Sequence, residues 1–368
     1  MYIYYIYTHM FTNSSKLFKN FVFPYMNIIK GKEINSLFHF LKERKKPSIE
    51  IVSQQKMQSR NIRLKNDFVN QHLIDITDSL KHEEKIIINI DGRSVFLNII
   101  SEENTDLLVE STISILELLY SIHPINKELH LNLFLTNETK MLESHSLPCD
   151  IGKNEVNSGS CERGHDKCIV NIWRKEEIIK VIFHELIHAF EYDNINDTHE
   201  LLTFYKQRYH LSSNKINIHE AYTEIWANIL NCFWISQKVN TNQYNNFRKL
   251  LSIEKEFAIF QCEKIMYFTN MKHSFIDINK HTNVLAYYII RCEIFNQLEI
   301  FLKICKDHNK NYIYIQNDKY LLSFFFKKSK EIKNLNQKIK LLKTNSYLYK
   351  NTRMSGIEYN TFMQPHPS

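Results

Sequence analysis

The sequence predicts an α+β protein in which a lobe built on a β-sheet precedes a mostly helical lobe. Between residues 85 and 173, short β-branched runs alternate with a helical pattern, whereas after residue 234 apolar residues recur with the 3.6-residue period of helices. Strands followed by helices in this way are typical of α+β folds. The chain has 368 residues, 43% hydrophobic and 24% charged, as expected of a globular protein with a full core.

The predicted sheet begins with a hairpin. Two β-branched runs, residues 85–90 and 94–100, are joined by Asp91-Gly92, a turn dipeptide that tolerates positive φ. The elements expected next are a helix over 106–120, a half-buried strand over 128–135, a short extended piece at 155–158 and a strand over 168–173. The last strand leads directly into the most apolar helix of the chain.

The second half of the chain is predicted to be helical. The elements expected there are helices over 254–268 and 282–305, an extended interruption at 312–315 and a basic amphipathic helix over 327–343. The chain then divides into an N-terminal region of unclear pattern (1–75), a sheet lobe with the apolar helix (76–192), a helical lobe (193–345) and a tail (346–368). We find no internal repeat.

The apolar helix contains a motif that is typical of metal sites, His184-Glu185-Leu-Ile-His188. On a helix the two imidazoles lie one turn apart on one face, so both reach one tetrahedral Zn²⁺. Glu185 lies beside the pair and can take a proton from a water that the metal activates. With 17 histidines the motif can also arise by chance, but two imidazoles on so apolar a helix are costly to bury without a shared partner.

A catalytic zinc needs a third protein ligand and one open position. The metzincin pattern would require glycine and histidine where the chain has Glu191 and Asn194, so that class is excluded. A second helix is predicted to begin near His219, and Glu220 and Glu224 lie one turn apart on it. Three further residues stay open as the third ligand: Glu224, His199 and Asp193.

The two motifs together resemble the gluzincins, the thermolysin-like branch of zinc metallopeptidases. By that resemblance His184, His188 and Glu220 are zinc ligands, Glu185 is the general base, and Glu224 holds a ligand imidazole in its tautomer. The resemblance implies a zinc-dependent peptidase acting on a peptide or protein, with a zincin-like lobe of twisted mixed sheet and active-site helix. The chain departs from compact gluzincins between His188 and Glu220, where an inserted helix and loop are expected.

The resemblance also implies residues that meet the substrate. In zincins an edge strand binds the peptide backbone, and Asn157, Ser158 and Gly159 stand at that position here. Gluzincins supply hydrogen-bond donors to the reacting carbonyl from a helical lobe, and the candidates here are His281, Tyr287, Tyr288 and Arg291. Three short segments together also look like uncharacterised zincin-like proteins of large DNA viruses, namely the Asn-Ser-Gly edge, Arg174-Lys-Glu-Glu before the apolar helix, and the His184–His188 motif.

A second group of metal-ligand types precedes the last predicted strand, namely Cys149, Cys161, His165 and Cys168. Their spacing fits no standard zinc finger, so free buried thiols are favoured over a second, structural zinc. Seven cysteines, an odd number, argue against a fully paired secreted framework and favour an intracellular, cytoplasmic protein.

Charge and hydropathy bear on the kinds of partner that the protein can have. The net charge of +7 is scattered along the sequence, so no nucleic-acid partner is expected, and no run reaches the roughly 18 apolar residues of a membrane span. Besides the peptidase, two other classes stay open. The second of them is a basic nucleic-acid-binding protein, which would need Lys and Arg clustered on one face with stacking aromatics. The first is a non-catalytic zincin-fold protein that uses its metal for structure or for partner binding. A fourth protein ligand on the metal would favour it.

Overall fold

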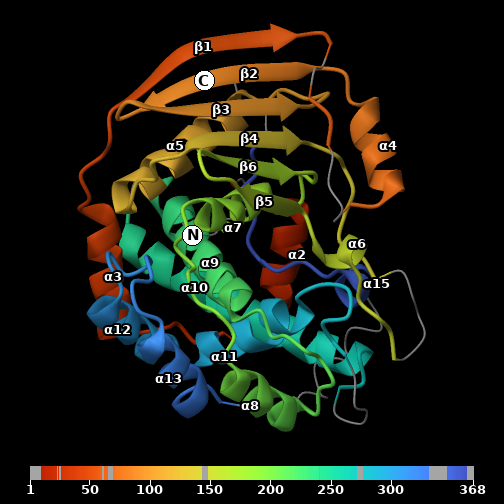
Figure 1. The fold of residues 1–368 in the computed structure, drawn as a ribbon, viewed down its shortest axis with the longest axis vertical. Helices are drawn as coiled ribbons and strands as arrows, with labels where there is room; N and C mark the ends of the chain where they lie inside the picture. Colours follow the sequence, from red (N-terminus) through yellow and green to blue (C-terminus); the bar gives the residue numbers. More distant parts are fainter. Residues whose placement is uncertain are drawn as a thin grey trace.

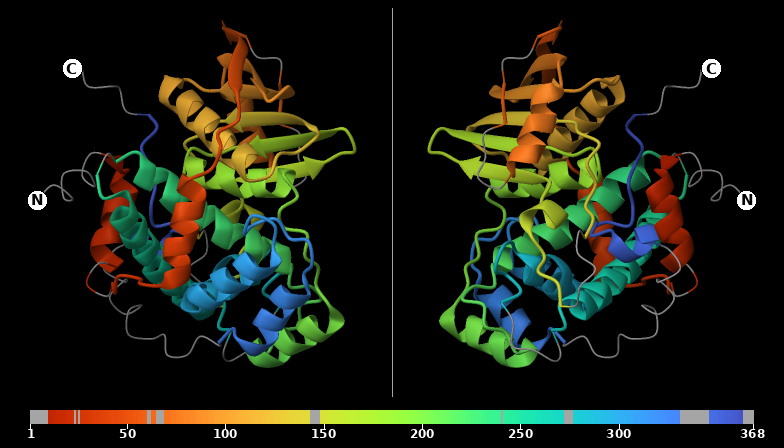
Figure 2. Two further views of the ribbon diagram at one scale, coloured as in Figure 1. Left: turned by 90° about the vertical axis from the view of Figure 1, so that its left-hand side faces the viewer. Right: turned by 90° about the vertical axis from the view of Figure 1, so that its right-hand side faces the viewer.

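The structure, a computed structural model, describes residues 10–22, 24, 26–59, 62–64, 69–142, 148–239, 241–271, 277–330 and 346–362. The sheet lies at one end of the molecule and most helices lie at the other (Figure 1). Seen from the side, these two parts form successive layers (Figure 2). The α+β prediction, with a mixed sheet followed by a helical region, is confirmed.

A six-stranded mixed sheet forms the first layer. Its strands are β1 (Ile49–Met57), β2 (Glu83–Ile90), β3 (Arg93–Ile100), β4 (Glu128–Phe134), β5 (Gly159–Arg163) and β6 (Lys167–Ile172). They stand in the order β1-β2-β3-β4-β6-β5, in which β3, β4 and β6 run parallel and the other neighbours antiparallel. The hairpin, predicted from Asp91-Gly92, is the β2–β3 pair. β5 therefore forms the edge of the sheet that faces the helices (Figure 1).

The two faces of the sheet differ in chemistry, as the alternation of side chains requires. Alternate residues of β2, from Ile86 to Ile90, are buried beneath helices. On the opposite face Asn98, Asn132 and Asn171 stand side by side on β3, β4 and β6, and their amides are hydrogen-bonded in a row at 2.9 and 3.0 Å. The row satisfies amides that are only 7% exposed, and it ties the three parallel strands together.

Two helices cover the apolar face. The helix α5 (Asp106–Ile122) contacts α7 (Ile178–Ala189), which packs against β5 and β6. A shorter helix, α4 (Gln71–Ser79), closes a small apolar cluster at the strand ends with Ile100, Phe134 and Trp173. The helix predicted over 106–120 and the strands predicted over 128–135 and 168–173 are confirmed.

The extended piece predicted at 155–158 is wrong. Residues 153–156 form one helical turn, α6 (Lys153–Val156), because the Glu155 carboxylate accepts a hydrogen bond from the Gly152 N–H at 2.9 Å and closes it. The edge strand β5 begins at Gly159, so Asn157 and Ser158 lie just before it.

The second layer is helical. Its elements are α8 (His199–Tyr209), α9 (Ile218–Gln237), α10 (Gln243–Phe268), a π-helical turn η2 (Leu285–Ile290), α11 (Arg291–Asn296), α12 (Leu298–His308) and α13 (Lys319–Lys327). The helix predicted over 282–305 is thus divided in three. The predicted extended piece at 312–315 is a tight turn, in which Asn311 and Tyr312 have φ of 53° and 66°. Most of the predicted helix 327–343 lies outside the described residues. Within the described parts of the chain, no helix is long and apolar enough to cross a membrane.

The N-terminal region contributes to both layers. Its helices α2 (Asn13–Val22) and α3 (Lys32–Lys42) pack against α10 and α12, whereas β1 joins the outer edge of the sheet. The Glu299 carboxylate on α12 accepts hydrogen bonds from the first N–H groups of α3, at 3.0 and 3.1 Å. This cap satisfies donors that a helix start leaves free, and it fixes the N-terminal helices to the helical layer.

The prediction of a C-terminal tail is wrong for the residues that the structure describes. After α15 (Ser346–Lys350) the chain enters the interior, and Thr352, Arg353 and Ser355 have no exposed surface. The Glu177 carboxylate, directly before α7, accepts hydrogen bonds from the N–H groups of Met354 and Ser355. Arg353 forms an ion pair with Glu358 at 3.0 Å. We name residues 351–358 the inserted segment.

Replacing Arg353 by methionine should destabilise the protein strongly. The change leaves the Glu358 carboxylate, only 9% exposed, without its cation, and breaking a buried pair costs about 3–5 kcal/mol. Urea unfolding followed by far-UV circular dichroism measures the loss. As a control, Arg93→Met at the start of β3 removes a guanidinium that is hydrogen-bonded to Asn126 in an exposed position, and should cost less than about 1 kcal/mol. Equal losses in the two variants would contradict the burial argument.

Candidate metal centre

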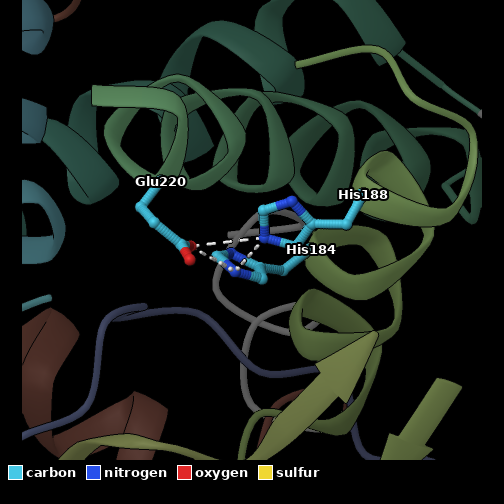
Figure 3. Close-up of side chains that lie close together, drawn as sticks. All are labelled: His184, His188 and Glu220. Carbon is cyan, nitrogen blue, oxygen red and sulfur yellow. Dashed lines mark hydrogen bonds and ion pairs between the residues drawn. The ribbon is translucent and has the colours of Figure 1, made fainter. Parts of the chain in front are cut away.

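Three side chains from two helices converge on one point between the layers (Figure 3). The distances are 3.2 Å between the Nε2 atoms of His184 and His188, 3.3 Å from His188 Nε2 to Glu220 Oε2, and 3.4 Å from His184 Nε2 to the same oxygen. Ligands about 2.0–2.1 Å from a tetrahedral zinc stand about 3.3–3.4 Å from one another. The three atoms therefore have the spacing of one triangular face of a zinc tetrahedron.

The third member of the trio depends on how α9 begins. The Asp197 carboxylate accepts hydrogen bonds from the N–H groups of residues 216, 217 and 218, at 2.7–2.9 Å. This cap fixes the first turn of α9, which carries Glu220. Asp197 precedes α8, and α8 with its flanking loops fills the interval between His188 and Glu220. The predicted insertion of a helix and loop is thus confirmed.

Each histidine is oriented from behind by a carboxylate. His184 Nδ1 lies 2.9 Å from Glu224 Oε2, and His188 Nδ1 lies 2.6 Å from Asp193 Oδ2. An ionised carboxylate only accepts hydrogen bonds, so each Nδ1–H donates and each Nε2 keeps its lone pair for a metal. Glu224 thus has the position that the resemblance implies. Asp193, expected as a possible ligand, instead orients His188.

Cationic side chains in turn hold these two carboxylates. Glu224 has no exposed surface, and it pairs with Lys180 and, at 3.1 Å, with Arg291. Asp193 accepts hydrogen bonds from Arg163 at 2.8 and 3.0 Å and from the Thr223 hydroxyl at 3.2 Å. Paired charges of this kind are far cheaper to bury than single ones.

The third ligand candidate is oriented as well. The Asn283 amide donates to Glu220 Oε1 at 3.0 Å and in turn accepts a hydrogen bond from the Asn217 amide. Oε1 is thereby occupied, and Oε2 alone faces the histidines. Sequence reasoning missed Asn283 and Arg163, because neither stands at a helical spacing from the motif. Asp193 could be considered from the sequence, because it stands only five residues after His188.

Burial and neighbouring charges shift the pKa values of the carboxyl groups in the site. Burial opposes charge on Asp193, but the neighbouring His188 and Arg163 lower its pKa to about 2. Burial likewise opposes charge on Glu220 and Glu224, yet His188 and Lys180 respectively hold the pKa of these carboxyls well below the usual range. Three acidic groups of the site are therefore ionised at neutral pH. Burial raises the pKa of Glu185, which differs from them in this respect.

Glu185 faces a cavity of about 620 Å³ between the two layers, which the trio also lines. A Cβ atom at position 159 would collide with the Glu185 side chain, so only glycine lets the edge strand approach this closely. Of the predicted substrate-edge residues, Asn157, Ser158 and Gly159 all line the cavity.

The four candidate donors separate into two pairs. His281 and Tyr287 line the cavity, and the Tyr287 ring centroid lies 5.9 Å from that of His184. Tyr288 and Arg291 do not line it. The Tyr288 hydroxyl donates to the Thr352 carbonyl, and Arg291 pairs with Glu224. Of the open third-ligand candidates, His199 does not line the cavity either.

The Cys149, Cys161, His165 and Cys168 side chains, for which free thiols were favoured over a second zinc, do not converge on one point. Among the residues that the structure describes, the trio is the one group of three or more metal-ligand side chains whose atoms converge. His165 is exposed, and Cys168 on β6 lies 3.6 Å from the Ala189 carbonyl. All seven cysteines are free thiols.

Comparisons with known proteins leave the chemistry open. No family profile and no solved structure matches the chain. An uncharacterized protein of Acanthamoeba polyphaga mimivirus is 25% identical over 229 residues, which cover 55% of this chain and 58% of that protein. The chain therefore spans less than two thirds of that relative, whose description names no activity.

Asp193→Asn should weaken zinc binding by about 10-fold to 100-fold, because losing the carboxylate that orients a ligand histidine typically costs that much. Competition titration with a chromophoric chelator measures the dissociation constant. Asp75→Asn, on the exposed side of α4, is the matched control and should bind zinc like the wild type. Unchanged affinity in Asp193→Asn would show that His188 needs no such partner.

Proposed function

We propose that the protein is a zinc-dependent peptidase in which His184, His188 and Glu220 hold the metal and Glu185 is the general base. The observation that carries the proposal is the mutual spacing of the three ligand atoms, 3.2–3.4 Å. A carboxylate also lies behind each imidazole. Two histidines and a glutamate that met by chance would not be expected to have these additional partners.

The donor chemistry suits zinc better than the common hard cations. Two imidazole nitrogens with one carboxylate oxygen are typical of catalytic zinc, whereas Ca²⁺ and Mg²⁺ prefer shells of oxygen. A set of three protein ligands leaves a position for water or substrate, which a purely structural site closes. Within the described residues, no fourth side chain joins the trio, and this favours catalysis over the non-catalytic alternative.

A zinc ion held there supplies Lewis-acid polarisation of a substrate carbonyl and lowers the pKa of water. Glu185 takes up the proton from the attacking water and passes it to the leaving amine. Its buried position raises its pKa towards the operating pH, which suits a group that both accepts and releases a proton. Because Gly159 lacks a side chain, the scissile bond can come close to Glu185.

The edge strand β5 suits a peptide as substrate. It pairs with β6 on one side and is the last strand in the sheet, so its other side offers backbone donors and acceptors for an extended chain. Gly159 and Cys161 of β5 line the cavity beside the metal centre. A peptide paired with β5 would therefore pass over His184 and Glu185.

The mimivirus relative is uncharacterized, so it does not test the expected likeness to zincin-like proteins of large DNA viruses. It gives no support to any particular reaction. The proposed activity rests on the site.

Glu185→Gln should abolish hydrolysis while metal binding is kept, because a general base contributes about 10²-fold to 10⁴-fold. A library of quenched fluorescent peptides identifies a substrate for the zinc-loaded wild type, and elemental analysis gives the zinc content of each variant. Glu50→Gln, at an exposed position of β1 on the opposite edge of the sheet, is the control and should retain full activity. Full activity in Glu185→Gln, or no hydrolysis of any peptide by the zinc-loaded wild type, contradicts the proposal.

Tyr287→Phe should lower kcat by about 10-fold to 100-fold and change KM little, because it removes a hydroxyl that lies beside the metal centre and can donate to the reacting carbonyl. Tyr288→Phe is the matched control. Its hydroxyl donates to the Thr352 carbonyl, so its loss should affect stability and leave kcat unchanged. Equal kcat values for Tyr287→Phe and the wild type would exclude Tyr287 as a donor.

A further inference from the structure

We propose that the cavity selects peptides with acidic side chains on either side of the scissile bond. The inference rests on the proposed peptidase function and names its substrate class. It is carried by the distribution of charge over the cavity wall, where cations and carboxylates occupy different depths.

The carboxylates lie at the base of the cavity. Glu185, Asp193, Glu220 and Glu224 are the four that line it, and none is an exposed residue. Three of them are engaged with the histidines, and Glu185 faces the metal centre. None of these groups is available at the mouth to repel an anionic substrate.

The exposed charged residues of the cavity wall are basic. They are Arg163, Lys215 and Lys280, and the exposed imidazole of His281 follows Lys280 in the chain. Arg163 and Lys280 are partly neutralised by Asp193 and Asp150, at 2.8 and 3.0 Å. Lys215 forms no ion pair with any described carboxylate, so it carries the strongest uncompensated charge at the mouth.

These cations lie on both sides of the metal centre. Arg163 is hydrogen-bonded to Asp193, just beyond the C-terminal end of α7, and Lys215 lies three residues before the start of α9. On the other side, His281 and Lys280 approach Asp150, and the Thr282 hydroxyl donates to Asn157 Oδ1 at 2.8 Å. A peptide that pairs with β5 and crosses Glu185 thus meets basic side chains before and after the bond that is cut.

Most Lys and Arg side chains that line the cavity are paired. Lys140 pairs with Glu177, Lys180 with Glu224 and Arg163 with Asp193, so the excess positive charge would come from Lys215 and from a bound dication. A cleft with low-dielectric walls focuses the field of such charges and raises the local concentration of anionic ligands.

The same observations favour an acidic peptide over a nucleic acid. Proteins that bind single-stranded nucleic acids stack bases on exposed aromatic rings. Among the described residues of the cavity wall, Tyr287 is the one Phe, Tyr or Trp, and it is only 8% exposed. The outer side of β5, the last strand of the described sheet, instead suits the backbone of an extended peptide.

The test measures binding without turnover. Zinc-loaded Glu185→Gln protein is titrated with three fluorescein-labelled decapeptides that differ only in carrying Glu, Gln or Lys at alternate positions, and anisotropy gives the dissociation constants. We expect the Glu peptide to bind about tenfold more tightly than the Gln peptide, since each exposed ion pair contributes up to about fivefold. The preference should shrink as salt is raised.

Reversing the charge of a single residue tests which side chain causes the preference for the Glu peptide. In the same background Lys215→Glu should reduce the Glu-over-Gln preference by at least about threefold, because it replaces the uncompensated cation at the mouth. Lys303→Glu, on the exposed surface of α12 and outside the cavity, makes the same change in net charge and should leave the preference intact.

Equal affinity for the Glu and Gln peptides, or equal effects of the two reversals, would overturn the proposal. A labelled single-stranded oligonucleotide that binds more tightly than the Glu peptide would overturn it in favour of a nucleic acid. A wild type that prefers the Glu peptide in binding but hydrolyses no peptide contradicts the proposed function and leaves the charge preference standing.

Discussion

The buried carboxylate of Glu224 joins more of the structure than any other group of the site. From α9 it contacts Lys180 and His184 on α7 and Arg291 on α11, and Arg291 also donates to the Met354 carbonyl in the inserted segment. Burying any one of these charges without its partner costs several kcal/mol. The helices α7, α9 and α11 are therefore stable in this arrangement only when they pack together. The orientation of a metal-binding imidazole therefore depends on the packing of three helices and the inserted segment.

Paired charges also link the C-terminal end of α7 to its surroundings. Asp193 orients His188 and is itself held by Arg163 from β5, so the edge strand and the metal centre share one ion pair. Gly159 then allows β5 to lie against Glu185. The sheet edge, Glu185 and the trio are thus fixed relative to one another, which is the arrangement that the proposed catalysis would require.

Local patterns predicted the parts of the site that depend on helical spacing. Two pairs stand one helical turn apart, His184 with His188 and Glu220 with Glu224. The apolar helix that contains the first pair was enough to identify it.

Contacts between residues far apart in the sequence could not be predicted from local patterns. Asn283 reaches Glu220 over 63 residues, and the inserted segment was taken for a tail because the carboxylate that binds it, Glu177, lies 177 residues earlier in the chain. The extended piece predicted at 155–158 does not form there, because Glu155 closes a helical turn before β5, which begins at Gly159.

The most direct test of the account is an anomalous difference map, recorded at the zinc absorption edge from crystals grown with zinc. We expect one peak about 2.0–2.1 Å from the Nε2 atoms of His184 and His188 and from Glu220 Oε2, with no fourth protein atom at ligand distance. A peak among Cys149, Cys161 and Cys168, a peak at the trio closed by a fourth side chain, or no peak at all would contradict a catalytic zinc centre.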